Sequence, residues 1–166
     1  AAQLFGRSLF DIQLARRGLD LSAGRSRAVL QEARLTELIS HDAVTLAPAT
    51  PLKAAISRLS QAGHGEAYLV DDRGRYQGCV TLAGLETLRE GSEATTLADC
   101  PETPRPVLDP HASLWEAMQQ LQKVTGEAIA VVDDERRFLG VAYESSIARA
   151  FLYHSDALRR EEHGAG

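Results

Sequence analysis

The side chains able to do chemistry in this sequence are two cysteines, five histidines and two pairs of neighbouring aspartates. Converging thiolates and imidazoles bind metals or act as nucleophiles and bases. The histidines are scattered, at His41, His64, His111, His154 and His163. Cys79 and Cys100 form no C-x-x-C pair, and no H-x-x-x-H spacing occurs. The sequence therefore predicts no metal site and two structural cysteines.

The paired carboxylates are Asp71 with Asp72 and Asp133 with Asp134. Two carboxylates can serve as acid and base in catalysis. Each pair, however, follows a short apolar run in a segment typical of a hairpin turn, where Asp bonds to nearby backbone amides. We interpret the pairs as turn residues, predict no catalytic residue, and expect a protein that is not an enzyme.

Composition and charge narrow the class of protein. The chain has 166 residues, of which 44% are hydrophobic and 25% charged, as in folded globular proteins. The longest apolar run, AIAVV at 128–132, is too short to cross a membrane, and no signal peptide or disulfide framework is evident, so a cytoplasmic setting is expected. Ala at position 1 suggests a piece of a longer chain, although loss of an initiator Met would also explain it.

The net charge of -5 is unevenly distributed along the chain. Residues 1–34 carry six Arg against three acidic residues, so the rest of the chain is acidic. An acidic body argues against a nucleic-acid partner. The basic segment suits a connector to a membrane-side surface, or is simply a solvated helix face.

The sequence repeats itself without a gap at an offset of 62 residues. YLVDDRGRYQGCVTLAGL (68–85) aligns with AVVDDERRFLGVAYESSI (130–147). The match extends upstream, where Leu46, Pro48 and Leu52 align with Leu108, Pro110 and Leu114. A match of this length indicates an internal duplication.

Each copy contains the pattern of a β-α-β-β-α unit. In the first, we expect strands at 44–46, 67–70 and 76–80, a helix begun by Thr50 and Pro51 and ended by Gly63, and a helix capped by Thr81. In the second, we expect strands near 106–108, 129–133 and 137–142, with helices at 113–124 and 143–153. The predicted organisation is a helical connector (1–34), repeat 1 (35–91), repeat 2 (92–153) and a C-terminal tail (154–166).

One copy is too small to bury its apolar surface alone. We therefore predict an α+β fold in which the two repeats pack about a pseudo-two-fold axis. A cleft between the related sheets is the expected place for a ligand.

The pattern φ-V-D-D-x-G-x-φ-x-G-φ-φ-T, seen at 69–81 ahead of a helix, resembles the CBS motif, and the tandem copy resembles a Bateman module. The resemblance covers about residues 35–153. It implies a regulatory module that dimerises and often binds adenine nucleotides in the cleft. By the same resemblance, a G-φ-φ-T-x-x-D stretch supplies a hydroxyl for phosphate or ribose and a carboxylate for the ribose diol.

This chain departs from that ligand-binding stretch. Gly84 and Ser146 stand where the two carboxylates are expected, and Tyr143 replaces the second Thr. Loss of a carboxylate-to-diol contact would weaken binding by roughly one to two decades. The remaining candidates for ATP, ADP or AMP, each of which could equally be core or rim, are Val44, Thr45, Tyr68, Thr81, Ile129, Tyr143 and Ser146.

The segment SLFDIQLARRGLDLSAGR (8–25) resembles the connector between the last membrane helix and the CBS pair of bacterial ClC-type chloride channels and transporters. It implies a cytoplasmic regulatory domain of such a protein, linked to an upstream membrane domain. The alternatives are an adenine-nucleotide-sensing CBS module of another transporter or a metabolic enzyme, and a ligand-free dimerisation domain.

A homodimer is expected on all three interpretations. The predicted helices carry more apolar positions than one face requires, namely Leu52, Leu85, Leu88, Leu114, Ile147 and Phe151. Some of this surface is expected to meet a second copy. Trp115 is expected in the core or at that interface, with the interface favoured.

Overall fold

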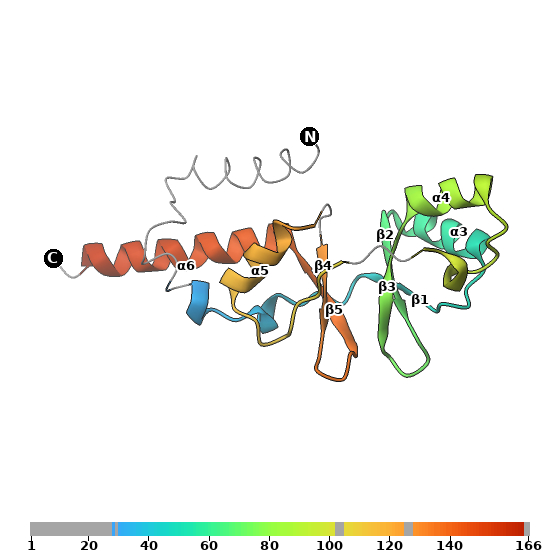
Figure 1. The fold of residues 1–166 in the computed structure, drawn as a ribbon. Coiled ribbons are helices and arrows are strands. Elements are labelled where there is room, and N and C mark those ends of the chain that lie inside the picture. The colour runs from blue at the N-terminus through green and yellow to red at the C-terminus, as the bar shows by residue number, and fades with distance from the viewer. Residues whose placement is uncertain (1–27, 29, 102–104, 125–127, 165–166) are drawn as a thin grey trace. The chain divides into compact units, whose positions relative to one another are not determined.

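The structure is a computed structural model that describes residues 28, 30–101, 105–124 and 128–164 (Figure 1). The ClC-like segment at 8–25 lies outside the described residues. Of the predicted helical connector, only residue 28 and residues 30–34 are described, and 28 and 30–32 are helical.

The order of elements confirms the α+β prediction. Repeat 1 holds the first β-α-β-β-α series, and repeat 2 keeps all of it except the opening strand. The elements are η1 (Leu35–Leu38), β1 (Val44–Leu46), α3 (Leu52–Ala62), β2 (Glu66–Val70), β3 (Tyr76–Thr81), α4 (Leu82–Gly91), η2 (Leu97–Asp99), α5 (Leu114–Leu121), β4 (Ala128–Val132), β5 (Phe138–Tyr143) and α6 (Glu144–Gly164).

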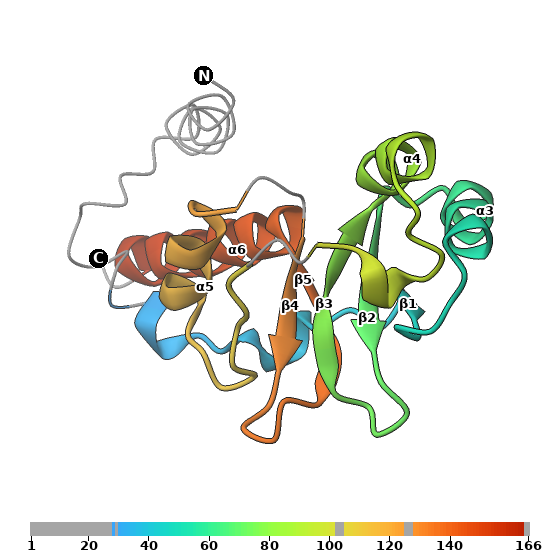
Figure 2. The same cartoon turned by 45° about the vertical axis from the view of Figure 1, so that its right-hand side comes forward.

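The chain divides into two compact units, each described here by itself. One unit comprises residues 1–40, 106–131 and 141–166, and the other comprises 41–105 and 132–140. In the second unit, β1 runs parallel to β2 and β2 antiparallel to β3. Helices α3 and α4 lie on one face of this sheet (Figures 1 and 2). The core between them comprises Leu46, Leu52, Ala55, Ile56, Leu59, Ala67, Leu69, Leu85 and Leu97.

Helix ends in repeat 1 follow local chemistry, with one correction. Gly63 ends α3 in the left-handed conformation, with φ of 69°, as predicted. Thr81 caps α4, because its hydroxyl accepts a hydrogen bond from the Gly84 amide at 3.1 Å. The predicted cap at Thr50 is wrong: Pro51 holds the N-cap position, and the first helical amide, that of Leu52, donates to the Thr95 carbonyl instead.

Repeat 2 differs from its prediction at both ends. The predicted strand at 106–108 is a single parallel bridge between Leu108 and Val131. Helix α6 extends to Gly164 instead of ending near 153, so most of the predicted tail is helical. Residues 154–163 contain no Pro or Gly and several strong helix formers, so the helix continues beyond its last buried turn.

The predicted surplus of apolar helix surface is wrong for most of the residues named. Leu52, Leu85, Leu114, Ile147 and Phe151 are all at most 5% exposed within one chain. Leu88 is half-buried. Among the described residues, the large hydrophobic side chains that are exposed are Val107 and Tyr153. The apolar faces of these helices are therefore largely buried in the core of the chain itself.

Candidate functional site

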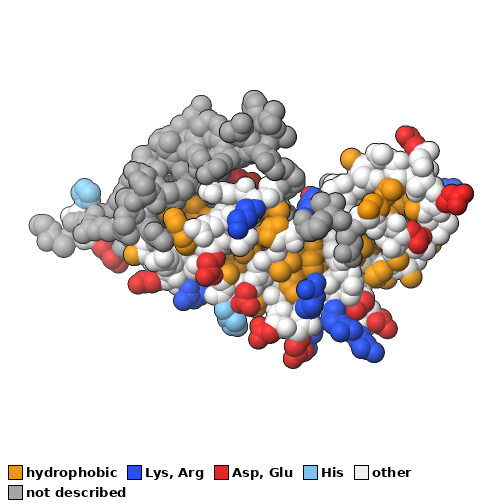
Figure 3. Space-filling model, in the orientation of Figure 1, with side chains coloured by type: hydrophobic (Ala, Val, Ile, Leu, Met, Phe, Trp, Pro, Cys, Tyr) orange, Lys and Arg blue, Asp and Glu red, His pale blue; other side chains and the backbone are white. Residues whose placement is uncertain are grey.

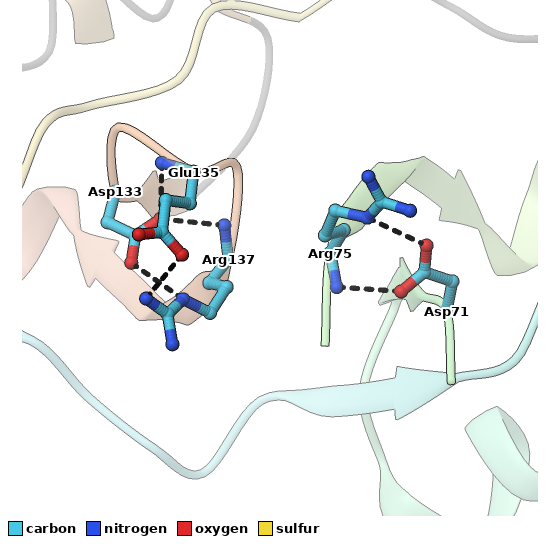
Figure 4. A network of polar contacts seen from close by, with 5 residues as sticks. All are labelled: Asp71, Arg75, Asp133, Glu135 and Arg137. Carbon is cyan, nitrogen blue, oxygen red and sulfur yellow. Dashed lines mark hydrogen bonds and ion pairs between the residues drawn. The ribbon is translucent and has the colours of Figure 1, made fainter. Parts of the chain in front are cut away.

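Both aspartate pairs act in turns, as the sequence predicts. Asp71 Oδ1 accepts hydrogen bonds from the amides of Arg73 and Arg75, both at 2.9 Å. Asp133 Oδ1 repeats this arrangement on the amides of residues 135 and 137, at 2.9 and 2.8 Å (Figure 4). The Arg75 amide, more than any other group, holds the pKa of Asp71 below its usual range. The first carboxylate of each pair thus accepts hydrogen bonds within its own hairpin, as expected of a turn residue.

The two hairpin turns lie against each other. Arg75 and Arg137 form an antiparallel bridge, and the amides of Tyr76 and Phe138 donate to carbonyls of the opposite turn, at 2.8 and 2.9 Å. Charged side chains of both signs gather over these turns (Figure 3). Arg75 and Arg137 each form an ion pair with an Asp of the same turn, so these charges are largely compensated locally.

The turns differ at one backbone position. Gly74 adopts φ of 78°, and its repeat equivalent, Arg136, adopts φ of 63°. A side chain in this left-handed region costs about 1–2 kcal/mol, and a Cβ at Gly74 would meet no atom within 4 Å.

We therefore expect opposite effects from exchanging these residues. Gly74→Ala should lower the free energy of unfolding by about 1 kcal/mol, for backbone reasons alone, whereas Arg136→Gly should leave it unchanged or raise it by up to about 1 kcal/mol. Urea denaturation of both variants measures the difference. Equal and parallel changes would contradict the assignment of left-handed backbone to both positions.

The strand registers show which predicted site residues share a face. Thr45 pairs with Tyr68, Tyr68 with Cys79, and Glu66 with Thr81. Paired residues, and residues two apart on a strand, point to the same face. These five side chains therefore lie on the face opposite α3 and α4. Val44 differs, because it packs against the core beneath the helices.

Tyr68 was predicted as a ring on which a ligand could stack. In the structure it is 4% exposed, and it stacks on Phe138 with ring centroids 5.5 Å apart and lies beside Tyr76 at 6.4 Å. Burial raises the pKa of its hydroxyl. The ring of Tyr68 is therefore enclosed by aromatic side chains of the chain itself.

Position 84 shows what the missing carboxylate changes locally. Thr81 Oγ1 accepts from the Gly84 amide, and a Cβ built at Gly84 would lie 2.9 Å from that oxygen. The Thr81 hydroxyl keeps its own proton to donate elsewhere. Any side chain at position 84 would require Thr81 to rotate.

The other predicted ligand residues belong to the other compact unit. Ile129 is 2% exposed, while Tyr143 and Ser146 are half-buried. That these three form one site with Thr45 and Thr81 stays a prediction.

The polar contact that sequence reasoning missed is an ion pair between Glu66 and Arg105. Arg105 Nη1 lies 2.8 Å from Glu66 Oε1, and the side chains of Arg105 and Glu66 are 17% and 22% exposed, respectively. The Tyr68 hydroxyl donates to the other carboxylate oxygen at 3.4 Å. Burial by itself would lower the pKa of Arg105, but the hydrogen bond and charge of Glu66 raise it overall. A comparison of the two copies could have marked this pair, because the positions equivalent to Glu66 and Arg105 are both Ala.

Cys79 lies beside this ion pair as a free, half-buried thiol. Burial raises its pKa to about 12. Cys100 is also free and half-buried, at the end of η2.

We expect Cys79 to react slowly in the folded chain, because the thiolate is the nucleophile and very little is present below pH 9. In a Cys100→Ser background, a disulfide reagent at pH 8 should modify Cys79 at least about 100-fold more slowly in the folded than in the urea-unfolded chain, whose thiol has a pKa of about 8.5. The folded-state rate should still rise with pH above 9. A rate that levels off near pH 8.5 would show an unperturbed thiol.

Neither a cluster of metal ligands nor a membrane-spanning helix occurs in the described part of the chain. No group of three or more His, Cys, Asp or Glu side chains there could hold a metal ion. No helix in that part is long and apolar enough to span a membrane.

Comparison with known proteins places these features in a family. The model of the CBS domain matches residues 35–85 and 97–153. No curated protein sequence matches the chain.

Three solved structures share the fold at low sequence identity. CbpB, in complex with c-di-AMP, has a TM-score of 0.71 at 13% identity, covering 82% of this chain and 96% of that one. CBSX2, in complex with AMP, has a TM-score of 0.63 at 17% identity, with coverages of 73% and 97%. The cytosolic domain of the Mg²⁺ channel MgtE, in complex with ATP, has a TM-score of 0.62 at 18% identity, with coverages of 76% and 52%. The two family matches and the repeated elements lead to one conclusion: the chain belongs to the CBS domain family and carries two CBS domains in tandem.

Proposed function

We propose that this CBS pair is a regulatory domain that acts by binding an adenine nucleotide, not by catalysis. The observation that carries the proposal is the similarity of its fold to CbpB, CBSX2 and MgtE, each crystallised with a ligand that contains adenine. The proposed ligands are ATP, ADP and AMP. Thr81 is the hydroxyl that would meet the ligand's phosphate or ribose.

Thermal unfolding of the purified chain, with and without each nucleotide, tests this proposal. A ligand at about 100 times its dissociation constant should stabilise the fold by about 2.7 kcal/mol. Guanosine and cytidine nucleotides at equal concentration control for salt and phosphate effects. The absence of any shift at millimolar adenine nucleotide would refute the proposal and favour the ligand-free alternative.

Restoring the carboxylate should strengthen binding. With the Thr81 hydroxyl shifted to admit the new Cβ, we expect Gly84→Asp to lower the dissociation constant for AMP by about 10- to 100-fold, the value of a hydrogen bond to a charged group. Gly84→Asn, which has the same shape without the charge, is the matched control. If both variants bind AMP as the unmodified chain does, position 84 is not at the ribose.

For the parent protein, we propose a bacterial ClC-type chloride channel or transporter, with this domain on the cytoplasmic side of the plasma membrane. The support is the L-A-R-R-G-φ-D-φ pattern at 14–21. Another transporter or a metabolic enzyme is the competing parent, and the likeness to the cytosolic domain of MgtE suits a transporter of another ion. Chloride flux through proteoliposomes of the full-length parent, with and without adenine nucleotide, separates these possibilities. A full-length parent that carries no chloride would exclude the ClC assignment.

We also propose that the domain functions as a homodimer. Because most of the apolar helix residues expected at the interface are buried in one chain, the support for a homodimer is the CBS family resemblance alone. Light scattering across a range of concentrations should give twice the mass of one chain. A monomer at high concentration would remove the proposal.

A further inference from the structure

The two copies of the repeat differ in polarity on one face of their hairpins. On the helix-free face of the β1–β2–β3 sheet, repeat 1 presents Glu66, Tyr68, Cys79 and Thr81. The equivalent positions of repeat 2 are Ala128, Ala130, Val141 and Tyr143. A duplicated core needs no such polarity, because the second copy folds with apolar residues at three of the four positions. The polar side chains of repeat 1 therefore require an explanation beyond folding.

Arg105 adds a positive charge to this polar face. Its repeat equivalent is Ala43, so this charge also has no counterpart in the other copy. Its side chain is only 17% exposed, and it reaches Glu66 across 39 positions of sequence. Withdrawing a guanidinium this far from water is costly unless its donors are used.

Most of those donors are unused within the described part of the chain. A guanidinium has five N–H groups in a planar fork, and Arg105 donates one hydrogen bond there, from Nη1 to Glu66. Glu66 accepts a hydrogen bond from one N–H group of the guanidinium and leaves the other N–H groups available. A planar fork with free N–H groups suits a phosphate, which it can bind through two parallel hydrogen bonds.

The register places a second donor close by. Glu66 and Thr81 are direct partners on neighbouring antiparallel strands, so their Cβ atoms lie about 5 Å apart. The Thr81 oxygen is occupied as an acceptor by the Gly84 amide, which leaves its proton to donate outward. The guanidinium and the hydroxyl thus flank Glu66 at one end of the sheet.

We propose that Arg105 binds the phosphate group of the ligand, with Thr81 as a second donor and Glu66 as the residue that positions the guanidinium. The choice of a nucleotide as the source of that phosphate rests on the proposed function. The assignment gives the chain one phosphate site, in repeat 1. It also names a charged contact that compensates in part for the carboxylates missing at Gly84 and Ser146.

The test compares AMP with adenosine, which differ by the phosphate alone, by calorimetry on the full 166-residue chain. The unmodified chain should bind AMP at least about 10-fold more tightly than adenosine. Arg105→Gln should reduce AMP affinity to that of adenosine and leave adenosine affinity unchanged. Arg105→Lys, which keeps the charge without the planar fork, should bind AMP with an affinity between those of the unmodified chain and Arg105→Gln. Arg58→Gln, an exposed Arg on α3, is the matched control and should change neither ligand.

If Arg105→Gln does not fold because Glu66 is left unpaired, the Glu66→Gln and Arg105→Gln double variant removes both charges and provides the same comparison. Equal loss of AMP and adenosine, or no loss of either, would overturn the Arg105 assignment while the nucleotide function stands. A chain that binds neither molecule would refute the nucleotide function. The side-chain Nε–H resonance of Arg105, titrated with inorganic pyrophosphate, then decides: a saturable shift supports a phosphate site with another source, and no shift refutes the site.

Discussion

Replacing Phe151 with Ala is expected to lower the free energy of unfolding by about 3–5 kcal/mol. Phe151 has no exposed surface and is the largest fully buried side chain among the described residues. It lies on α6, which packs on α5 and η1. Truncation removes a whole aromatic ring from water-excluded contact and leaves a cavity that its neighbours can fill only in part. Since small domains are stable by about 5–15 kcal/mol, this single change should remove much of the total.

Tyr153→Ala, two residues further along the same helix, is the matched control. Tyr153 is 73% exposed, so its loss should change stability by no more than about 0.5 kcal/mol. Urea denaturation of both variants measures the difference in stability. The denaturation midpoint should shift in Phe151→Ala, while the dependence of the unfolding free energy on urea concentration stays unchanged. A change below about 1 kcal/mol for Phe151→Ala would mean that α6 does not pack as described.

Glu66→Ala is expected to destabilise the fold by about 3 kcal/mol. Removal of one member of a buried ion pair leaves the other charge uncompensated, which costs about 3–5 kcal/mol when burial is complete. Arg105 and Glu66 retain some exposure, which moves the expectation to the lower end of that range. The Tyr68 hydroxyl also loses its acceptor.

A double-mutant cycle separates the free energy lost with the ion-pair attraction from the cost of leaving one charge buried and unpaired. The Glu66→Ala and Arg105→Ala double variant should be more stable than Glu66→Ala alone, because no unpaired charge remains. Glu135→Ala is the control, since its ion pair with Arg137 is short, at 2.6 Å, but exposed, and should contribute at most about 1 kcal/mol. Equal effects at Glu66 and Glu135 would show that the Glu66 pair is solvated after all.

The sequence was a sound guide at most positions where a local rule was decisive, although the cap expected at Thr50 is an exception. Gly63 and Thr81 mark helix ends through backbone conformation and a single hydroxyl, so residue type alone predicts them. Asp71 and Asp133 bond to amides two and four positions away, which a turn motif contains within itself. The repeat predicted the order of elements and the family, because the two aligned copies predict the same elements and the same family.

Features that depend on distant partners were not predictable in the same way. The pairing of Arg105 with Glu66 joins a linker to a strand and has no local signal, although its absence from the other copy is a hint. Enclosure of Tyr68 depends on Phe138 arriving from the second hairpin. The strand expected at 106–108 has Pro106 where the first copy has Val44, so one backbone donor is missing, and the segment makes a single bridge, at Leu108. Arg136 takes a conformation typical of Gly because its turn copies the geometry of the first.

The central claim is that this CBS pair binds an adenine nucleotide through repeat 1. Isothermal titration of the unmodified chain with AMP tests it most directly. We expect a saturable heat that fits one site per chain, and a lower affinity for AMP in Arg105→Gln. No measurable heat and no competition between AMP and ATP at millimolar concentration would contradict it.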